Sequence, residues 1–276
     1  MQRPLGIAVA AIASCASAEE AAPTIPPTPP PPPLRKVAPG SQKNIIFLLT
    51  DDQDLRLGSM GAMPFTMEHI THAGANISNY FIHTPIVSLS PLRSAAPCFC
   101  LLPPSHEPRA DYPRVRQCCP SRTTLMSGSF VHNNKVESAT AGGCMRVNTS
   151  RTVPGGRPSF WEHSFIRRLR YDHNYATGVF GKLLNNMATY GCDGNEPTTP
   201  HGLDRTFIMC NPNFFNENWA NYTTSGGSVV FTGSEPANYT TSLVGNTSLE
   251  WIKSIVSQGK DPPPFFAYLG PHAPHL

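Results

Sequence analysis

The sequence predicts an α/β fold with a mostly parallel sheet, on the basis of three observations. A continuous apolar run at residues 44–50 has the length of a strand and is typical of one buried on both faces of a parallel sheet. Two similar runs lie at residues 175–181 and 264–270. The segment 247–259, directly before the last run, has the apolar spacing of an amphipathic helix. Strands that alternate with helices are typical of the α/β class.

The helix at this last segment is predicted to present an apolar face to the sheet. Its apolar residues Leu249, Ile252, Ile255 and Val256 fall on one side of a helical projection. Gly259 then supplies a stop signal. We therefore expect this face to be buried.

The first 40 residues are predicted to lie outside the folded domain. Residues 1–18 have the positive start, short apolar run and small-residue cleavage site of a secretory signal peptide. The apolar run is too short to span a bilayer, and Cys15 leaves a lipoprotein signal as the alternative. Residues 19–40 are rich in proline and predict a disordered linker with polyproline II character. The domain is therefore expected to occupy residues 41–276.

Composition limits the partners that this chain can have. The net charge is +3 and the basic residues are scattered, which argues against a nucleic-acid partner. No later segment is long and apolar enough to predict a membrane span. Five glycosylation sequons support secretion to an extracellular, cell-wall or lysosome-like compartment. These sequons lie at Asn76, Asn148, Asn221, Asn238 and Asn246.

Polar residues follow the end of each predicted strand. Asp51 and Asp52 follow the first strand, Lys182 the second and His272 the third. In open α/β sheets, ligands bind beyond the carboxyl ends of the strands. Two adjacent carboxylates at such an end repel each other and lose solvation, so they need a cation or strong hydrogen-bond donors. A hard cation such as Ca²⁺, or Mg²⁺ as the alternative, suits ligands that are all oxygen. A solvated acidic turn explains the same stretch, and the stretch alone slightly favours that explanation.

The segment Cys118–Gly128 predicts a short helix with unusual first residues. Pro120 suits the first turn of a helix, and Gly128 suits its end. Cys118 at the helix N-terminus and Arg122 one turn later form a site suited to a tetrahedral anion. A disulfide bond from one of the two adjacent cysteines fits the sequence equally well. The absence of a spaced C-x₂-C pair argues against zinc.

This same stretch carries a resemblance to a known family. CCPSRTTLMSG resembles the sulfatase signature C-x-P-S-R-x-x-x-[LM]-[TS]-G, in the form found in the arylsulfatase and N-acetylglucosamine-6-sulfatase branch. The stretches NIIFLLTDDQD, NYFIHTPI, FGKLLN and FFAYLGPHAPH resemble that branch in the same order. The resemblance covers most of residues 43–276 and implies the alkaline-phosphatase-like fold. It also implies a sulfuric ester hydrolase that acts on an aryl sulfate or a sulfated sugar.

The resemblance implies a chemical reason for Cys118. In sulfatases, the first cysteine of this motif is oxidised to formylglycine by a formylglycine-generating enzyme during export. The hydrated aldehyde attacks sulfur with one hydroxyl, and its second hydroxyl allows collapse to the aldehyde and release of sulfate. A serine would remain trapped as its sulfate ester, so the modification permits turnover.

The family's other functional residues have counterparts in this chain. Asp51 and Asp52 match ligands of a divalent cation, which the modified Cys118 would join. The remaining matches are Arg122, which holds the modified side chain, Lys182, which binds sulfate, and His272, which binds sulfate or protonates the leaving oxygen. His275 is a weaker second choice for the histidine. Many sulfatases also carry a histidine where this chain has Leu184, and we expect the following Asn185 to substitute for it.

Residues 87–117 interrupt the resemblance. This insert begins with Val-Ser and ends with Gln, as translated splice donor and acceptor sites do, so we predict a retained intron. A surface loop is the alternative, although long structureless loops are uncommon in compact domains. With the insert, Cys15 and Cys118 set aside, an even number of cysteines remains, and their pairing stays open. They are Cys119, Cys144, Cys192 and Cys210.

The sequence stops at Leu276, soon after PHAPH. Sulfatases continue with further metal ligands, a second lysine and a smaller C-terminal domain. We therefore expect an incomplete catalytic domain that is inactive or barely stable as written. The alternative to an active hydrolase is a catalytically inactive secreted glycoprotein or truncated gene product. A phosphatase of the same fold is disfavoured, because it would carry a Ser or Thr nucleophile.

Overall fold

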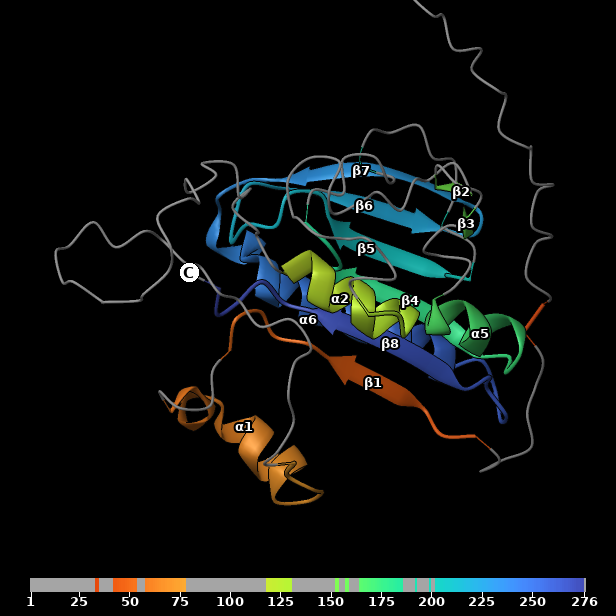
Figure 1. Ribbon diagram of the computed structural model, residues 1–276, viewed down its shortest axis with the longest axis horizontal. Helices are drawn as coiled ribbons and strands as arrows, with labels where there is room; N and C mark the ends of the chain where they lie inside the picture. Colours follow the sequence, from red (N-terminus) through yellow and green to blue (C-terminus); the bar gives the residue numbers. More distant parts are fainter. Residues whose placement is uncertain are drawn as a thin grey trace, which may run out of the picture.

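Figure 1 shows the computed structural model of the chain. The predicted signal peptide, nearly all of the proline-rich linker and the insert at residues 87–117 lie outside the described residues, as do Asp54 and Asn148. No helix that the structure describes combines the length and the apolar character that crossing a membrane requires. The structure describes residues 33–34, 42–53, 58–77, 118–130, 152–153, 157–158, 164–185, 192, 199 and 202–275.

A six-stranded mixed sheet forms the centre of the described structure, in the order β1-β8-β4-β5-β6-β7. The first four strands in this order run parallel, and the last two are antiparallel. The predicted α/β class with a mostly parallel sheet is confirmed. The strands are β1 (Ile45–Leu48), β4 (Ala176–Gly181), β5 (Arg205–Met209), β6 (Glu217–Thr223), β7 (Gly226–Thr232) and β8 (Phe265–Gly270).

The helices lie on both faces of this sheet (Figure 1). Helices α2 (Cys118–Ser127) and α5 (Phe165–Tyr171) cross one face, and α6 (Thr240–Val256) lies behind the other. The remaining elements are short. They are η1 (Ser59–Ala62), α1 (Pro64–Thr66), η2 (Met67–Thr71), η4 (Pro236–Asn238) and the two-stranded pair β2 (Thr152–Val153) and β3 (Arg157–Pro158).

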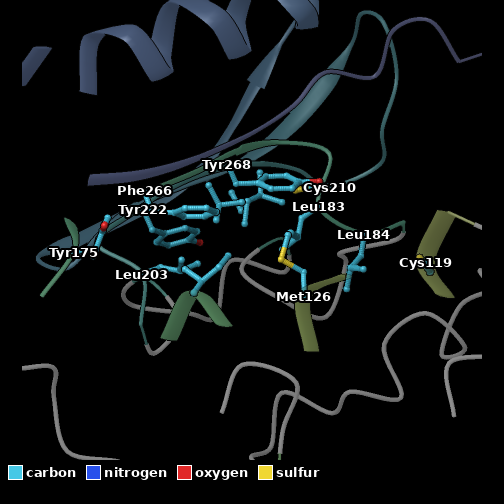
Figure 2. Packing of buried hydrophobic residues seen from close by; sticks show 14 residues of the cluster. Cys119, Met126, Tyr175, Leu183, Leu184, Leu203, Cys210, Tyr222, Phe266 and Tyr268 are labelled. Carbon is cyan, nitrogen blue, oxygen red and sulfur yellow. The ribbon is translucent and has the colours of Figure 1, made fainter. Parts of the chain in front are cut away.

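Alternate residues of the central strands supply two separate cores. Val179 and Tyr268 pack on the α2 side with Met126, in the cluster that Figure 2 shows. The adjacent residue Phe180 packs instead with Val244 of α6. This alternation is the period of two that a strand covered on both faces requires.

Strand β1 departs from the prediction. It is parallel to β8, as expected, but Ile46 and Leu48 are 57% and 44% exposed. The strand lies at the edge of the sheet, and among the described residues only β8 pairs with it. The apolar run correctly predicted a parallel strand, whereas burial on both faces was wrong because that requires neighbours that the run does not specify.

Helix α6 confirms the predicted helix but corrects its start and its buried face. It begins seven residues earlier than the predicted segment, and Leu249 and Val256 are 49% and 44% exposed. The buried face instead consists of Val244, Ser248 and Ile255, which are spaced by whole helical turns. Leu249 and Val256 were therefore assigned to the wrong face, while the helix itself is confirmed.

Two strand ends approach closely at Gly181, the last residue of β4. Gly181 has φ +88°, and a Cβ there would lie 2.2 Å from the carbonyl oxygen of Gly270. The next residue, Lys182, donates its backbone N–H to that same oxygen at 2.7 Å. A side chain at position 181 would thus separate the ends of β4 and β8, where functional residues were predicted.

We expect Gly181→Ala to lower the free energy of unfolding by more than about 2 kcal/mol, because it adds backbone strain and a collision with a carbonyl. Gly245→Ala is the matched control, since it lies inside α6 with no atom within 4 Å of the added methyl. The control should raise stability by about 0.5–1 kcal/mol. Urea unfolding of the two variants measures both effects, and equal midpoints would contradict this account of the strand ends.

Candidate active site

The carboxyl ends of three adjacent parallel strands bring the predicted residues together. Asp51 follows β1, Lys182 follows β4 and His272 follows β8. The strands are held in register past their ends, since the N–H of Leu49 donates to the carbonyl of Leu269 at 2.9 Å. The sequence alone suggested this meeting point, because neighbouring parallel strands end at the same edge of a sheet.

Asp51 lies at the centre of this group. Its side chain is 3% exposed, Arg122 Nη2 donates to its Oδ1 at 3.0 Å, and Lys182 Nζ donates to its Oδ2. His272 Nδ1 lies 3.3 Å from Oδ2, within ion-pair distance but without hydrogen-bond geometry. Burial raises the pKa of Asp51, but the His272 side chain and the charges of Arg122 and Lys182 outweigh burial and hold the pKa below its usual value.

Arg122 connects helix α2 to the strand ends. Its side chain is 4% exposed, and Nη1 donates both to the carbonyl oxygen of Lys182 and to the hydroxyl of Tyr268, each at 2.6 Å. The Tyr268 hydroxyl donates in turn to the Lys182 carbonyl at 3.1 Å. Tyr268 was not predicted from the sequence, because one tyrosine inside an apolar strand gives no signal of a polar partner.

The two adjacent cysteines have different states. Cys118 is a free, half-buried thiol, and Cys119 is fully buried and disulfide-bonded, with its partner outside the described residues. A second disulfide joins Cys192 and Cys210. The disulfide alternative is therefore realised at Cys119, and the anion site expected at Cys118 stays a prediction.

The Cys118 thiol faces the charged group. Its Sγ lies 3.4 Å from Lys182 Nζ. Burial raises the pKa of this thiol, Lys182 opposes that shift, and Asp51 and Asp52 add to it. Helix α2, with Gly128 at φ +65° directly after its last residue, begins at Cys118 as predicted.

Both histidines of PHAPH lie in the same group. The His272 ring contacts the rings of Phe214 and His275, with centroids 4.8 and 4.6 Å away. His275 Nε2 lies 3.4 Å from Asp52 Oδ2 and 4.0 Å from Asp51 Oδ2. His275 was only a second choice from the sequence, yet its ring nitrogen lies within ion-pair distance of the Asp52 carboxylate.

Leu184, where many sulfatases carry a histidine, and Asn185, the expected substitute, both contact the α2 side of the structure. Leu184 is 1% exposed in the core on the α2 side. Asn185 donates its backbone N–H to Cys119 Sγ at 3.0 Å. Its contact is thus with the disulfide-bonded cysteine, and its expected substitution for a histidine stays a prediction.

The turn between β5 and β6 supports His272 and was not predicted. Glu217 is 1% exposed, and its Oε1 accepts the backbone N–H groups of Cys210, Asn211 and Asn218 at 3.0–3.1 Å. Thr240 donates its N–H to the carbonyl of Phe214 at 3.0 Å. These bonds fix the turn that places the Phe214 ring against His272. No sequence pattern identifies a lone glutamate as the acceptor of three backbone donors.

The predicted glycosylation sites that the structure describes differ in their exposure. Asn76 and Asn246 are exposed and Asn238 is half-buried. Asn221 is half-buried within β6, between β5 and β7. Glycosylation at these positions stays a prediction, and Asn221 has the least open surroundings of the four.

The donor atoms around Asp51 do not match the expected hard cation. Ca²⁺ takes six to eight oxygen ligands. Here both carboxylate oxygens of Asp51 already accept from Arg122 and Lys182, and the next donor atoms are the thiol of Cys118 and the imidazole of His275. The described residues, in their cysteine form, therefore do not make a calcium site.

Known proteins similar to this chain are sulfatases, although no family model matches it. A "putative extracellular sulfatase Sulf-1 homolog" of Caenorhabditis elegans is 30% identical over 85% of this chain and 26% of its own length. An arylsulfatase of Volvox carteri is 25% identical over 88% of this chain and 30% of its own. The human N-acetylglucosamine-6-sulfatase is 25% identical over 87% of this chain and 36% of its own. The chain thus spans about a quarter to a third of these relatives.

A solved structure shows the same fold. The "putative sulfatase yidJ" of Bacteroides fragilis superposes with a TM-score of 0.55 at 16% identity, covering 88% of this chain and 46% of that one. The chain therefore has the alkaline-phosphatase-like fold and is a homologue of the sulfatases. Its relatives include both the arylsulfatases and the N-acetylglucosamine-6-sulfatases, the branch that the motif resembled.

Asp51→Asn should lower stability at neutral pH by about 3–5 kcal/mol, because it leaves two buried cations without their partner. Since the folded-state pKa of Asp51 lies below 3.8, its ionised form stabilises the fold above that pH and this stabilisation is lost as pH falls below it. The free energy of unfolding of Asp51→Asn should therefore fall less than that of the parent as the pH is lowered. Urea unfolding from pH 7 to pH 3 measures this, with Asp52→Asn, 29% exposed, as the matched control. If the stability of Asp51→Asn fell with pH as steeply as that of the parent, the stabilising role given to the ionised Asp51 would be wrong.

Glu217 should make stability depend on pH in the direction opposite to that of Asp51. Burial raises its pKa from 4.5 to about 7, although backbone N–H groups of the turn oppose the shift. The folded state thus holds a proton that the unfolded state has lost, so stability falls as pH rises from 4.5 to about 7. Glu217→Gln should remove this fall, and the exposed Glu235→Gln should keep it. Identical profiles for both variants in thermal unfolding would rule out the effect.

Proposed function

We propose that this chain carries the nucleophile and sulfate-binding residues of a sulfuric ester hydrolase. One observation carries the proposal: the free Cys118 thiol lies 3.4 Å from the Lys182 ammonium at the edge of the sheet. The sulfatase relatives support the same chemistry. The chain covers only part of those relatives, so the activity belongs to the proposal.

Cys118 is suited to modification to formylglycine. It is the free cysteine of the pair, it lies at the first residue of α2, and its neighbour Cys119 is tied into a disulfide. Formylglycine supplies, as its hydrate, an oxygen nucleophile that can release sulfate again. A formylglycine-generating enzyme is therefore a proposed partner during export.

The surrounding residues would bind and orient the sulfate ester. Lys182 and Arg122 place two cations beside position 118, and their positive charge suits the sulfate oxygens. Asp51 holds both cations through its two carboxylate oxygens. His272, with Nδ1 towards Asp51, has its other ring nitrogen free to hold or donate a proton at the leaving oxygen.

The substrate class follows from the relatives rather than from the geometry. An aryl sulfate or a sulfated sugar is proposed, because the similar proteins include arylsulfatases and N-acetylglucosamine-6-sulfatases. Secretion is proposed on the predicted signal peptide and on relatives named as extracellular sulfatases. A divalent cation, calcium or magnesium, is proposed for the converted protein, with Asp51 and Asp52 among its ligands.

The modification is testable by mass spectrometry. The chain should be produced in a secretory host together with a formylglycine-generating enzyme, reduced, and cleaved after Arg116 and Arg122. The peptide 117–122 is expected to carry an aldehyde at Cys118, trapped with a hydrazide. Cys119→Ser is the matched control and should keep the aldehyde, while Cys118→Ser should lose it. An unmodified Cys118 in the presence of the active converting enzyme would overturn the proposed modification.

The hydrolysis is tested on the same converted protein. Cleavage of a chromogenic aryl sulfate in preference to the matching aryl phosphate would support the hydrolase and overturn the expectation, drawn from the sequence, that the chain is inactive as written. Lys182→Ala and His272→Ala should each lower kcat/KM by roughly 10²-fold or more, because each removes a group that touches the reacting sulfate or leaving oxygen. A converted chain that cleaves neither ester would support the inactive secreted glycoprotein instead.

A further inference from the structure

The imidazole of His272 has no hydrogen bond that fixes its orientation. Its buried Nδ1 lies 3.3 Å from Asp51 Oδ2, and this nitrogen has no hydrogen-bond partner among the described residues. Both oxygens of Asp51 already accept from Arg122 and Lys182. In enzymes that use a histidine to move a proton, a hydrogen bond from one ring nitrogen to a carboxylate or carbonyl usually orients the ring. The orientation of His272 must therefore come from packing.

The ring of Phe214 supplies this packing. Its centroid lies 4.8 Å from that of the His272 ring, and the two planes are tilted by 48°. His275 also contacts the His272 ring, but its side chain is 30% exposed and so less constrained. We propose that Phe214 is a positioning residue for His272, whose ring it keeps turned with Nδ1 at Asp51 and with Nε2 directed away from that carboxylate. This role rests on the proposed function, in which His272 holds or donates a proton at the leaving oxygen.

The backbone on both sides of the Phe214 ring is held in place. The N–H of Phe214 donates to Asn213 Oδ1 at 2.8 Å, and the carbonyl of Phe214 accepts from the N–H of Thr240 at 3.0 Å. The hydroxyl of Thr240 donates to the carbonyl of Asn213 at 2.8 Å. Thr240 is the first residue of α6 and is fully buried. The turn that carries Phe214 is thus attached to a helix that packs against the sheet.

Glu217 closes the same turn from β6. Its Oε1 accepts three backbone N–H groups, two at the start of the turn and one at its end. The disulfide between Cys192 and Cys210 ties the start of the turn to a second segment. The Oε2 of Glu217 has no hydrogen-bond partner among the described residues. An effect of Glu217 on His272 therefore has to pass through the turn and Phe214.

The chemical consequence of this contact concerns the proton rather than the charge. A His272 ring that rotates still lies beside the sulfate, but it no longer holds a proton in line with the leaving oxygen. Loss of the Phe214 ring should therefore lower kcat and leave KM nearly unchanged. The loss should be largest for esters of weakly acidic alcohols, because such leaving groups need the proton most.

Phe215 provides the matched control. It is the next residue of the same turn and is half-buried like Phe214. Both rings pack against Tyr239, with centroids 5.5 Å away for Phe215 and 6.4 Å away for Phe214. Among the described residues of this turn, the ring contact with His272 comes from Phe214. Alanine at position 215 should thus disturb the turn to a similar extent without releasing the imidazole.

The first test measures the order of the His272 ring by carbon-13 relaxation in the full, unconverted chain, with His272→Gln to assign the signal. We expect an order parameter of about 0.85 in the parent, as in rigid backbone. Phe214→Ala should lower it below about 0.6, whereas Phe214→Tyr and Phe215→Ala should leave it unchanged. Glu217→Ala should lower it as well, and Glu217→Gln, which keeps a side-chain oxygen for the backbone donors, should not. Circular dichroism checks that each variant is folded.

The second test uses the converted protein and two aryl sulfates. Phe214→Ala should lower kcat at least about tenfold on phenyl sulfate, whose leaving phenol is weakly acidic, and less than about threefold on 4-nitrophenyl sulfate. Phe215→Ala should change kcat by a similar factor on both esters. An equal loss on both esters in Phe214→Ala would overturn the positioning of the proton.

The two tests separate this role from the proposed function. An unchanged order parameter in Phe214→Ala, or an equal fall in Phe215→Ala, would overturn the role of Phe214 whether or not the chain is active. If the order parameter changes as expected but the converted chain cleaves no ester, Phe214 does orient His272 and the proposed function is wrong.

Discussion

The carboxylate of Asp51 holds together the edge of the sheet at which the candidate site lies. Taken alone, a buried carboxylate loses solvation that only strong partners can replace. Here one oxygen accepts from Arg122 of the helix that starts at Cys118, and the other accepts from Lys182 after the central strand β4. The same group therefore joins a helix and two strand ends, and it fixes where the thiol lies relative to the ammonium.

The backbone at the strand ends makes this arrangement possible. Gly181 at φ +88° lets β4 and β8 come close enough for the N–H of Lys182 to bond the carbonyl of Gly270. Lys182 then takes part in the site through two of its groups. Its carbonyl oxygen accepts from Arg122, and its ammonium donates to Asp51. Position and charge in this site are thus set by main-chain geometry as much as by the side chains.

How much the sequence could predict depended on whether a residue's role was local. The strand ends at Asp51, Lys182 and His272 were predictable, because an apolar run followed by a polar residue is a local signal. Tyr268 was not, because its hydroxyl meets Arg122 from far along the chain. Glu217 was not, because its backbone donors lie within seven residues but meet its side chain only through the turn between β5 and β6. The predicted burial of β1 was wrong for the same reason. The exposure of β1 depends on its place at the edge of the sheet, and the seven residues of the apolar run do not specify that place.

The paired cysteines show how one local motif can serve two requirements. Cys119 is buried and disulfide-bonded, so it can tie the first turn of α2 to another segment. Cys118, one residue away and so rotated by about 100° on the helix, is directed to Lys182 and the acidic group instead. A disulfide at 118 would remove the free thiol from the group around Asp51, and a free thiol at 119 would lose the anchor. The helical rotation between adjacent residues thus allows the chain to keep one cysteine as a free thiol next to one that is in a disulfide.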